Sequence, residues 1–124
     1  MGTPTARIED YYDALRSGDP LAPFFAPDDD LVKYGISERL VGYDAVAAGL
    51  RAQTETTENW TVGSDALRVS ERDGTAWFSD SVRLAWTDSE SGERHDFETR
   101  WSGTLRERET WLFVGMHVSV AREF

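Results

Sequence analysis

Three features are scarce or missing in this sequence, and each shortage excludes a class of protein. Cysteine is absent from the 124 residues, which excludes disulfide bonds and thiolate chemistry. Lysine occurs once, as Lys33, and no basic patch is visible, which argues against nucleic-acid binding. No apolar run near the N-terminus is long enough for a signal peptide or a membrane span. We therefore expect a soluble, cytoplasmic protein that binds neither nucleic acid nor a membrane.

Acidic residues, in contrast, are abundant. Asp and Glu total 23 against 13 Lys and Arg, which gives a net charge of -10, and the carboxylates are spread along the chain. A high net charge keeps a protein soluble where salt is concentrated. We interpret this as the composition of an acidic protein from a halophilic source.

Helix signals dominate the first half of the chain. Thr3 is a suitable N-cap for a helix over 4–17, which carries an apolar stripe and is followed by glycine. A second, short helix is expected over 19–27 and a third over 42–53, with a short strand over 31–36 between them. The pattern therefore predicts three N-terminal helices.

Strand signals fill the second half. Asp73-Gly74 is a strong hairpin turn, and a change in the apolar alternation at Gly63-Ser64 suggests a bulge. The expected strands span 60–72, 75–87, 94–106 and 110–121. Helices followed by a meander predict one α+β domain over residues 1–124, in which three helices lie against a curved antiparallel sheet.

The order of these elements resembles the nuclear-transport-factor-2-like superfamily, in particular its SnoaL-like and AtzH-like branch. The stretches that carry the resemblance are VKYGISERLVGYDAVAAGLRAQ, SVRLAWTD, FETRW and WLFVGMHVS. The last three are also similar to strands of the calcium/calmodulin-dependent kinase II association domain. The resemblance implies a cone-shaped sheet that encloses a pocket. The superfamily includes cofactor-free isomerases, cyclases and dehydratases, binding modules and oligomerisation domains, so the fold alone does not decide the function.

Two arginines inside the predicted strands are the foremost candidates for a binding site. Arg83 and Arg100 match, by resemblance, arginines that line the association-domain pocket and attract carboxylates. Strand alternation places Trp77 on the face of Arg83, and Glu98 on the face of Arg100. If these side chains face the inside of the cone, both guanidinium groups can bind an anionic organic ligand. The alternative is a structural network in which they pair with Glu98 or another acid.

Tyr34 and His117 complete the candidate ligand-binding set. Tyr34 lies in a strand that should approach the cone, where its hydroxyl could polarise a carbonyl, although such a tyrosine is more often a core residue. His117 could act as a general acid or base, or it could be a histidine already satisfied at the sheet. Asp80 and Glu98 are the in-strand carboxylates that could serve as a base.

The other face of the predicted sheet is too apolar to be left in water, so we expect a homodimer through it. Its members are Phe78, Val82, Leu84, Trp86, Phe97, Trp101, Leu105, Trp111, Phe113 and His117. We expect no metal, since the two histidines are distant and Asp28-Asp29-Asp30 lacks the pattern of a calcium loop, and no cofactor. Three functions remain open: a small-molecule-binding protein, a cofactor-free isomerase, cyclase or dehydratase, and a dimerisation module without a ligand.

Overall fold

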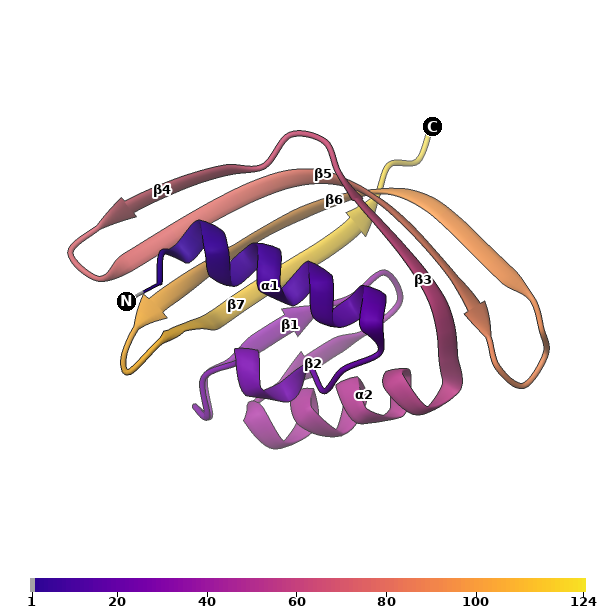
Figure 1. Ribbon diagram of the computed structural model, residues 1–124, viewed down its shortest axis with the longest axis horizontal. Helices are drawn as coiled ribbons and strands as arrows, with labels where there is room; N and C mark the ends of the chain where they lie inside the picture. The colour runs from indigo at the N-terminus through magenta and orange to yellow at the C-terminus, as the bar shows by residue number, and fades with distance from the viewer. Residues whose placement is uncertain (1) are drawn as a thin grey trace.

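A curved seven-stranded sheet forms the frame of the molecule (Figure 1). The computed structural model describes residues 2–124. The strands lie in the order β2-β1-β7-β6-β5-β3, with β4 also paired to β5, and the strand pairs are antiparallel apart from β1 with β7. Their bounds are β1 Val32–Tyr34, β2 Arg39–Val41, β3 Thr57–Ser64, β4 Arg68–Arg72, β5 Thr75–Asp88, β6 Arg94–Glu107 and β7 Trp111–Val120.

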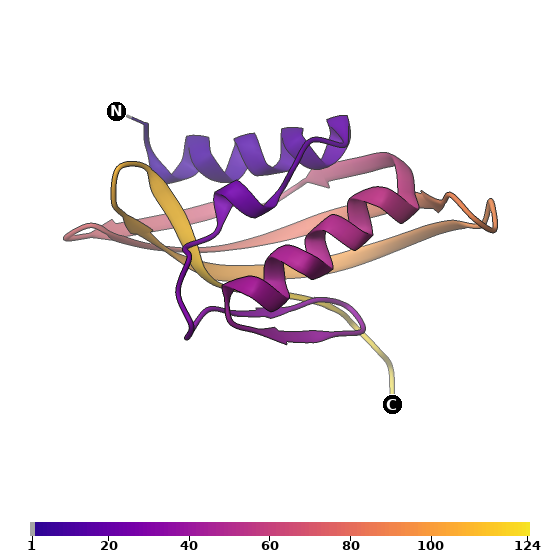
Figure 2. The ribbon, with the colours of Figure 1, turned by 90° about the horizontal axis from the view of Figure 1, so that it is seen from below.

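Two α-helices lie on one side of the long strands (Figure 2). Helix α1 spans Pro4–Ser17; the Thr3 side chain accepts a hydrogen bond from the Ala6 amide at its start, and Gly18, with φ of 71°, ends it. Helix α2 spans Tyr43–Thr56. The first and third predicted helices are thus confirmed, because each has a clear apolar stripe.

The second predicted helix is wrong. The segment over 19–27 contains only the short 3₁₀ helix η1, Ala22–Phe24, and Phe25 is already extended. Proline at positions 20, 23 and 27 explains the difference, since proline has no amide hydrogen and disfavours a helical residue before it. The α+β class is confirmed, with two α-helices rather than three in residues 2–124.

The strand predictions need two corrections. The expected strand over 60–72 is divided into β3 and β4, and its irregularity lies between Glu58 and Thr61, where Asn59 has a φ of 56°. Strand β2 was not predicted, because three residues carry too little periodic signal. The predicted hairpin turn is confirmed: Asp73 and Gly74 have φ values of 51° and 76°.

A bulge in β7 reverses which residues face the helices. Thr104 pairs with Gly115 and Leu105 pairs with Phe113, so Val114 is the additional residue. Phe113 is buried before the bulge and Met116 after it. The predicted apolar face therefore does not run unbroken from Trp111 and Phe113 to His117, which is exposed.

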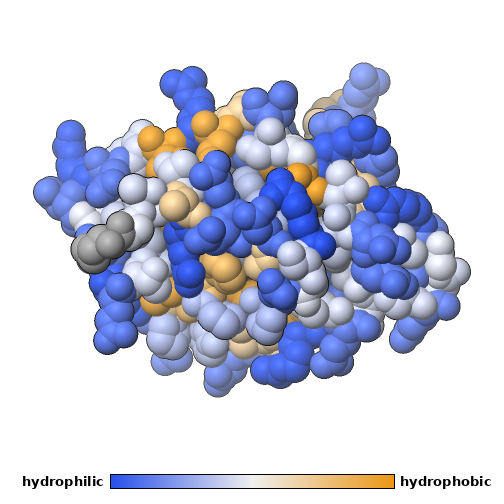
Figure 3. All heavy atoms as spheres, in the orientation of Figure 1, coloured by the Kyte–Doolittle hydropathy of each residue, from blue (hydrophilic) through white to orange (hydrophobic). Residues whose placement is uncertain are grey.

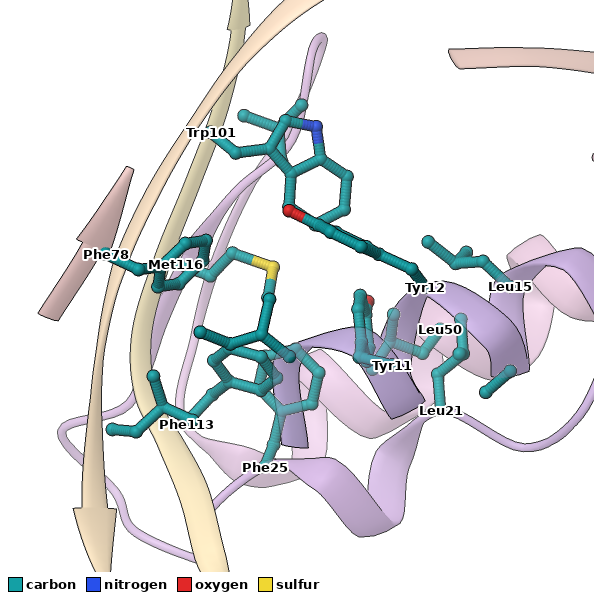
Figure 4. Close-up of a cluster of buried hydrophobic side chains, with 14 of the residues drawn as sticks. Tyr11, Tyr12, Leu15, Leu21, Phe25, Leu50, Phe78, Trp101, Phe113 and Met116 are labelled. Carbon is teal, nitrogen blue, oxygen red and sulfur yellow. The ribbon is translucent and has the colours of Figure 1, made fainter. Parts of the chain in front are cut away.

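The apolar face predicted as a dimer interface is mostly the core of the molecule. Figure 4 shows Trp101, Phe113 and Met116 of the sheet meeting Tyr11 and Tyr12 of α1. The two tyrosine rings lie edge-on, at 5.3 Å from Phe113 for Tyr11 and at 5.4 Å from Trp101 for Tyr12. Helices cover this face because their own apolar stripes must be buried against something. The buried members of the predicted set are Phe78, Val82, Leu84, Trp101, Leu105, Trp111 and Phe113.

The side of the molecule seen in Figure 3 is mostly hydrophilic, with scattered apolar patches. Among residues 2–124, no helix has both the length and the apolar character needed to cross a bilayer.

Candidate functional site

A cavity of about 350 Å³ lies between the two helices and the sheet. Helices α1 and α2 form one side, strands β5, β6 and β7 form the other, and the turn after β1 lies at its rim. Its apolar wall consists of Leu15, Trp60, Leu84, Trp86, Trp101, Met116 and Val118. Both the volume and the apolar wall are typical of a small-molecule site.

Lys33 places the chain's one lysine amine at this cavity. In β1, alternation turns Lys33 inward, where only 5% of the residue is exposed, while Tyr34 turns outward. The Nζ atom lies 3.4 Å from Oε1 of Glu38, and this is its one hydrogen bond to the residues that the structure describes. Burial lowers the pKa of the Lys33 amine, and the Glu38 carboxylate partly opposes that effect.

The Tyr11 hydroxyl is a second polar group of the cavity wall. It makes no hydrogen bond to the residues that the structure describes, and it is not among the fully buried unsatisfied atoms. Burial raises the pKa of Tyr11, and the nearby Glu38 carboxylate raises it further. The phenol therefore stays protonated near neutral pH and can donate a hydrogen bond to a ligand.

Indole rings supply most of the flat apolar surface. Trp60 and Trp86 are stacked, with ring centroids 4.9 Å apart and an interplanar angle of 19°. The Trp60 indole N–H donates to Thr57 Oγ1 and that of Trp101 donates to Thr99 Oγ1, each at 2.9 Å. Because these N–H groups already have partners, both rings offer a ligand mainly their apolar faces.

The two arginines lie on the opposite side of the sheet from the cavity. Arg83 and Arg100 are exposed, as are Trp77 and Glu98, whereas the alternate residues Val82 and Leu84 are buried. The prediction that these four side chains line the cone is wrong. Strand alternation allows one set to face inward, and burial of the valine and leucine side chains decides which set it is.

Arg83 instead makes a structural ion pair at the surface. Its Nε and Nη2 donate to the two carboxylate oxygens of Asp96, at 3.1 and 2.7 Å. This hydrogen-bonded pair lowers the pKa of Asp96 and raises that of Arg83. The alternative of a structural network therefore describes Arg83, with Asp96 rather than Glu98 as its partner.

Tyr34 and His117 also lie outside the cavity. Their rings are 5.2 Å apart, and the Tyr34 hydroxyl accepts a hydrogen bond from Arg39 Nε at 3.2 Å. Tyr34 is 40% exposed, so its predicted place on the cone wall is wrong. The structure brings these two residues together on the outer face, and a binding role for them there stays a prediction.

Asp80 faces inward, but both oxygens of its carboxylate already accept hydrogen bonds from protein groups. Its carboxylate accepts hydrogen bonds from the Tyr12 hydroxyl at 2.8 Å, the Ser64 hydroxyl at 2.6 Å and the Ala66 amide at 3.0 Å. It does not line the cavity. These contacts make Asp80 a structural carboxylate that ties α1 to β5 and to the end of β3.

Sequence reasoning missed Lys33 and Glu38 as site residues. A signal for Lys33 was present, since a lone lysine occupies the middle of a short predicted strand in a chain otherwise poor in lysine. For a metal, residues 2–124 contain no suitable group of three His, Asp or Glu side chains.

Comparisons with known proteins identify the family and bear on the fold. The family model for the SnoaL-like domain matches residues 5–123. The chain belongs to the SnoaL-like family. No curated protein matches its sequence.

Solved structures of this SnoaL-like chain's relatives share its fold at low identity. A candidate dehydratase of the NTF2-like family from Streptomyces avermitilis has a TM-score of 0.84 at 16% identity, covering 96% of this chain and 94% of that one. A candidate calcium/calmodulin-dependent protein kinase II association domain from Xanthomonas campestris has a TM-score of 0.79 at 20% identity, covering 97% and 86%. A ketosteroid isomerase-like protein from Erwinia carotovora atroseptica has a TM-score of 0.77 at 18% identity, covering 96% and 94%.

Proposed function

We propose that this protein binds a small organic molecule that has a flat apolar body and one carbonyl or anionic oxygen. The body lies against the indole rings of the cavity, and the oxygen accepts hydrogen bonds from Lys33 and Tyr11. The observation that carries the proposal is the Lys33 amine, which is buried beside apolar side chains and makes one long hydrogen bond, to Glu38, among the residues that the structure describes.

The energetics of a buried amine support this role. An ammonium group removed from water is costly unless hydrogen bonds replace its hydration. Glu38 is 3.4 Å away and its side chain is 42% exposed, so it compensates Lys33 only in part. A ligand oxygen in the cavity would give the amine the partner that the fold does not supply.

The test uses 2-naphthoate as a probe and 2-methylnaphthalene as its uncharged counterpart. Binding to the parent protein is measured by quenching of tryptophan fluorescence. Lys33→Met should weaken 2-naphthoate binding about 10- to 100-fold, the loss of one hydrogen bond to a charged group, while the affinity for 2-methylnaphthalene changes little.

Arg83→Met is the matched control, because it removes a cation from the outer face. It should leave the affinity for both probes unchanged. Equal loss of 2-naphthoate binding in Arg83→Met and Lys33→Met, or no binding by the parent protein, would contradict the proposal.

A second candidate is a cofactor-free isomerase, cyclase or dehydratase. It is favoured by Glu38, a carboxylate that lines the cavity beside Lys33 and could transfer a proton. The likeness to a candidate dehydratase and to an isomerase-like protein supports the same class. The enzyme is favoured if the protein eliminates water from a β-hydroxy ketone and if Glu38→Gln loses this activity while it still binds the ligand.

A dimerisation module without a ligand is less favoured, since side chains do not fill the cavity.

A further inference from the structure

We propose that Lys33 forms a reversible imine with an aldehyde or ketone held in the cavity. This inference rests on the proposed binding function and adds a chemical class of ligand, a carbonyl compound that becomes covalently attached. For the proposed binding function, Lys33 acts only as a hydrogen-bond donor to a ligand oxygen. A primary amine in an apolar cavity can in addition act as a nucleophile.

Burial favours the nucleophilic form of the amine. An amine attacks a carbonyl carbon only when it is unprotonated, and an exposed lysine is almost fully protonated at neutral pH. Lys33 is 5% exposed, and its wall of the cavity includes Met116 and Trp101. Desolvation by these surroundings lowers the pKa of the amine and so increases the unprotonated fraction.

Glu38 is placed to move the protons that imine formation requires. Its Oε1 lies 3.4 Å from Lys33 Nζ, and its side chain is 42% exposed, so it can exchange protons with both the amine and the solvent. Tyr11 lines the same cavity as a hydroxyl that burial keeps protonated. It can donate a hydrogen bond to the carbonyl oxygen and polarise the carbon under attack.

The reaction balances without any further reagent. The Nζ lone pair forms a C–N bond, the carbonyl π electrons move to oxygen, and a proton lost by nitrogen is transferred through Glu38 to that oxygen, giving a carbinolamine. A second proton transfer converts the hydroxyl into water, which leaves as the C=N bond forms. The amine and the carbonyl compound thus become an imine and one water molecule, and hydrolysis reverses the reaction.

The composition of the chain makes the test unusually specific. Lys33 is the one lysine and cysteine is absent, so the N-terminal amine is the other primary amine to consider. The parent protein is incubated with 2-naphthaldehyde and sodium cyanoborohydride at neutral pH, which reduces an imine to a stable secondary amine. Intact mass and peptide mapping then locate the adduct.

We expect the main adduct on Lys33, formed several-fold faster in the folded protein than in urea, since the lowered pKa increases the unprotonated fraction of the amine. 2-Naphthoate should slow its formation by competition. Lys33→Arg, which keeps the charge and cannot form the imine, should show no adduct at position 33, and N-terminal labelling should be the same in both proteins.

Labelling of the N-terminus alone, or equal labelling of Lys33 in folded and unfolded chains, would overturn the inference. If 2-naphthoate quenches tryptophan fluorescence and yet Lys33 is not labelled, the imine is wrong and the proposed binding function stands. If neither compound binds, both are wrong. The folded-against-unfolded comparison uses the parent chain alone, so it decides the question even if Lys33→Arg fails to fold.

Discussion

Lys33 lies in the three-residue strand β1, between the half-buried Val32 and the exposed Tyr34. The side chain enters the core because the strand alternates, and Glu38 is its one hydrogen-bond partner in residues 2–124. A buried amine with a single long contact destabilises the folded state whenever it is protonated. At the scale of a single residue, the Lys33 amine that is proposed to bind a ligand therefore lowers the stability of the protein without a ligand.

The pH dependence of stability should reveal this weakness. Burial lowers the Lys33 pKa in the folded state, so at pH values between that pKa and about 10.4 the unfolded chain binds more protons than the folded one. The free energy of unfolding should then rise with pH in this window. Urea unfolding from pH 7 to 9 measures it, a range in which an exposed tyrosine, with a pKa of about 10, stays mostly protonated.

Lys33→Met removes the titrating group and serves as the reference. The variant should be more stable than the parent by about 1 kcal/mol or more near neutral pH, and the difference should shrink as pH rises. A parent and a variant with parallel pH profiles would show that the Lys33 amine is not destabilised in the fold.

Neighbouring tyrosines on α1 should respond differently to loss of a hydroxyl. The Tyr12 hydroxyl donates to Asp80 at 2.8 Å in the core, so Tyr12→Phe should lower the free energy of unfolding by about 1.5–3 kcal/mol. Tyr11 lines the cavity without a protein partner among the described residues, so Tyr11→Phe should change stability little and weaken 2-naphthoate binding. Urea unfolding and fluorescence titration of both variants check this, and the reverse pattern would contradict our assignment.

At the scale of the secondary-structure elements, β6 and β7 approach each other closely beside the bulge in β7. A Cβ atom added to Gly103 of β6 would lie 2.6 Å from the Gly115 carbonyl oxygen and 2.8 Å from the Phe78 ring. Both distances are far below van der Waals contact. Because one neighbour is a backbone oxygen and the other is a buried ring, neither can easily move aside to make room for an added methyl group.

Gly103→Ala should therefore lower the free energy of unfolding by about 1–3 kcal/mol. Gly63→Ala, in β3, is the matched control, since its added Cβ would be 3.7 Å from the nearest atom, Cβ of Arg83. It should be neutral or should stabilise by about 0.5–1 kcal/mol. Chemical denaturation compares the two, and equal effects would contradict the importance of the close approach at Gly103.

The elements also show how far a sequence can predict this structure. Helix α1 and the Asp73-Gly74 turn were predicted because their signals are local: a cap, a stripe and a turn-forming pair. The inward face of the sheet was not predicted correctly. Alternation divides each strand into two sets of residues without showing which set faces inward, and the bulge in β7 exchanges the two sets part-way along that strand. Because the face that carries Arg83 and Arg100 was assumed to be the inner one, the predicted site was placed on the wrong side of the sheet.

The cavity could be predicted from family resemblance, whereas its polar groups could not. Lys33, Glu38 and Tyr11 come from a strand, a turn and a helix, and only packing brings them to one place. Their chemistry also depends on burial, which composition does not reveal. The sequence of β1 showed a lone lysine, but only the structure shows that this side chain is buried.

At the scale of the whole molecule, a net charge of -10 should make stability depend on salt. Repulsion among surface carboxylates destabilises the compact state, and salt shortens its range from about 30 Å at 0.01 M to about 3 Å at 1 M. The melting temperature should rise by several degrees over that range, as our prediction of a halophilic source requires. Asp29→Asn with Asp30→Asn should show a smaller rise, and a salt-independent melting temperature would contradict this.

A homodimer stays a prediction, but the surface that could form it has changed. Trp101 is buried among core residues, so Trp101→Glu should unfold the protein rather than separate two copies. Trp77 is 48% exposed on the outer face, and Trp77→Glu should leave the fold intact and abolish a dimer formed there. Circular dichroism and sedimentation measure both, and a parent protein that sediments only as a 14.0 kDa monomer would contradict the dimer.

The position of β7 has a consequence for how the chain folds. It follows all the other strands in the sequence, yet it lies between β1 and β6 in the sheet. During synthesis, β1, β2 and α2 therefore leave the ribosome without the strand that joins them to the meander, and the long separation makes that closure slow. Until β7 is added, β1 with Lys33 is paired with β2 but not with the meander, so the cavity is completed in one late step.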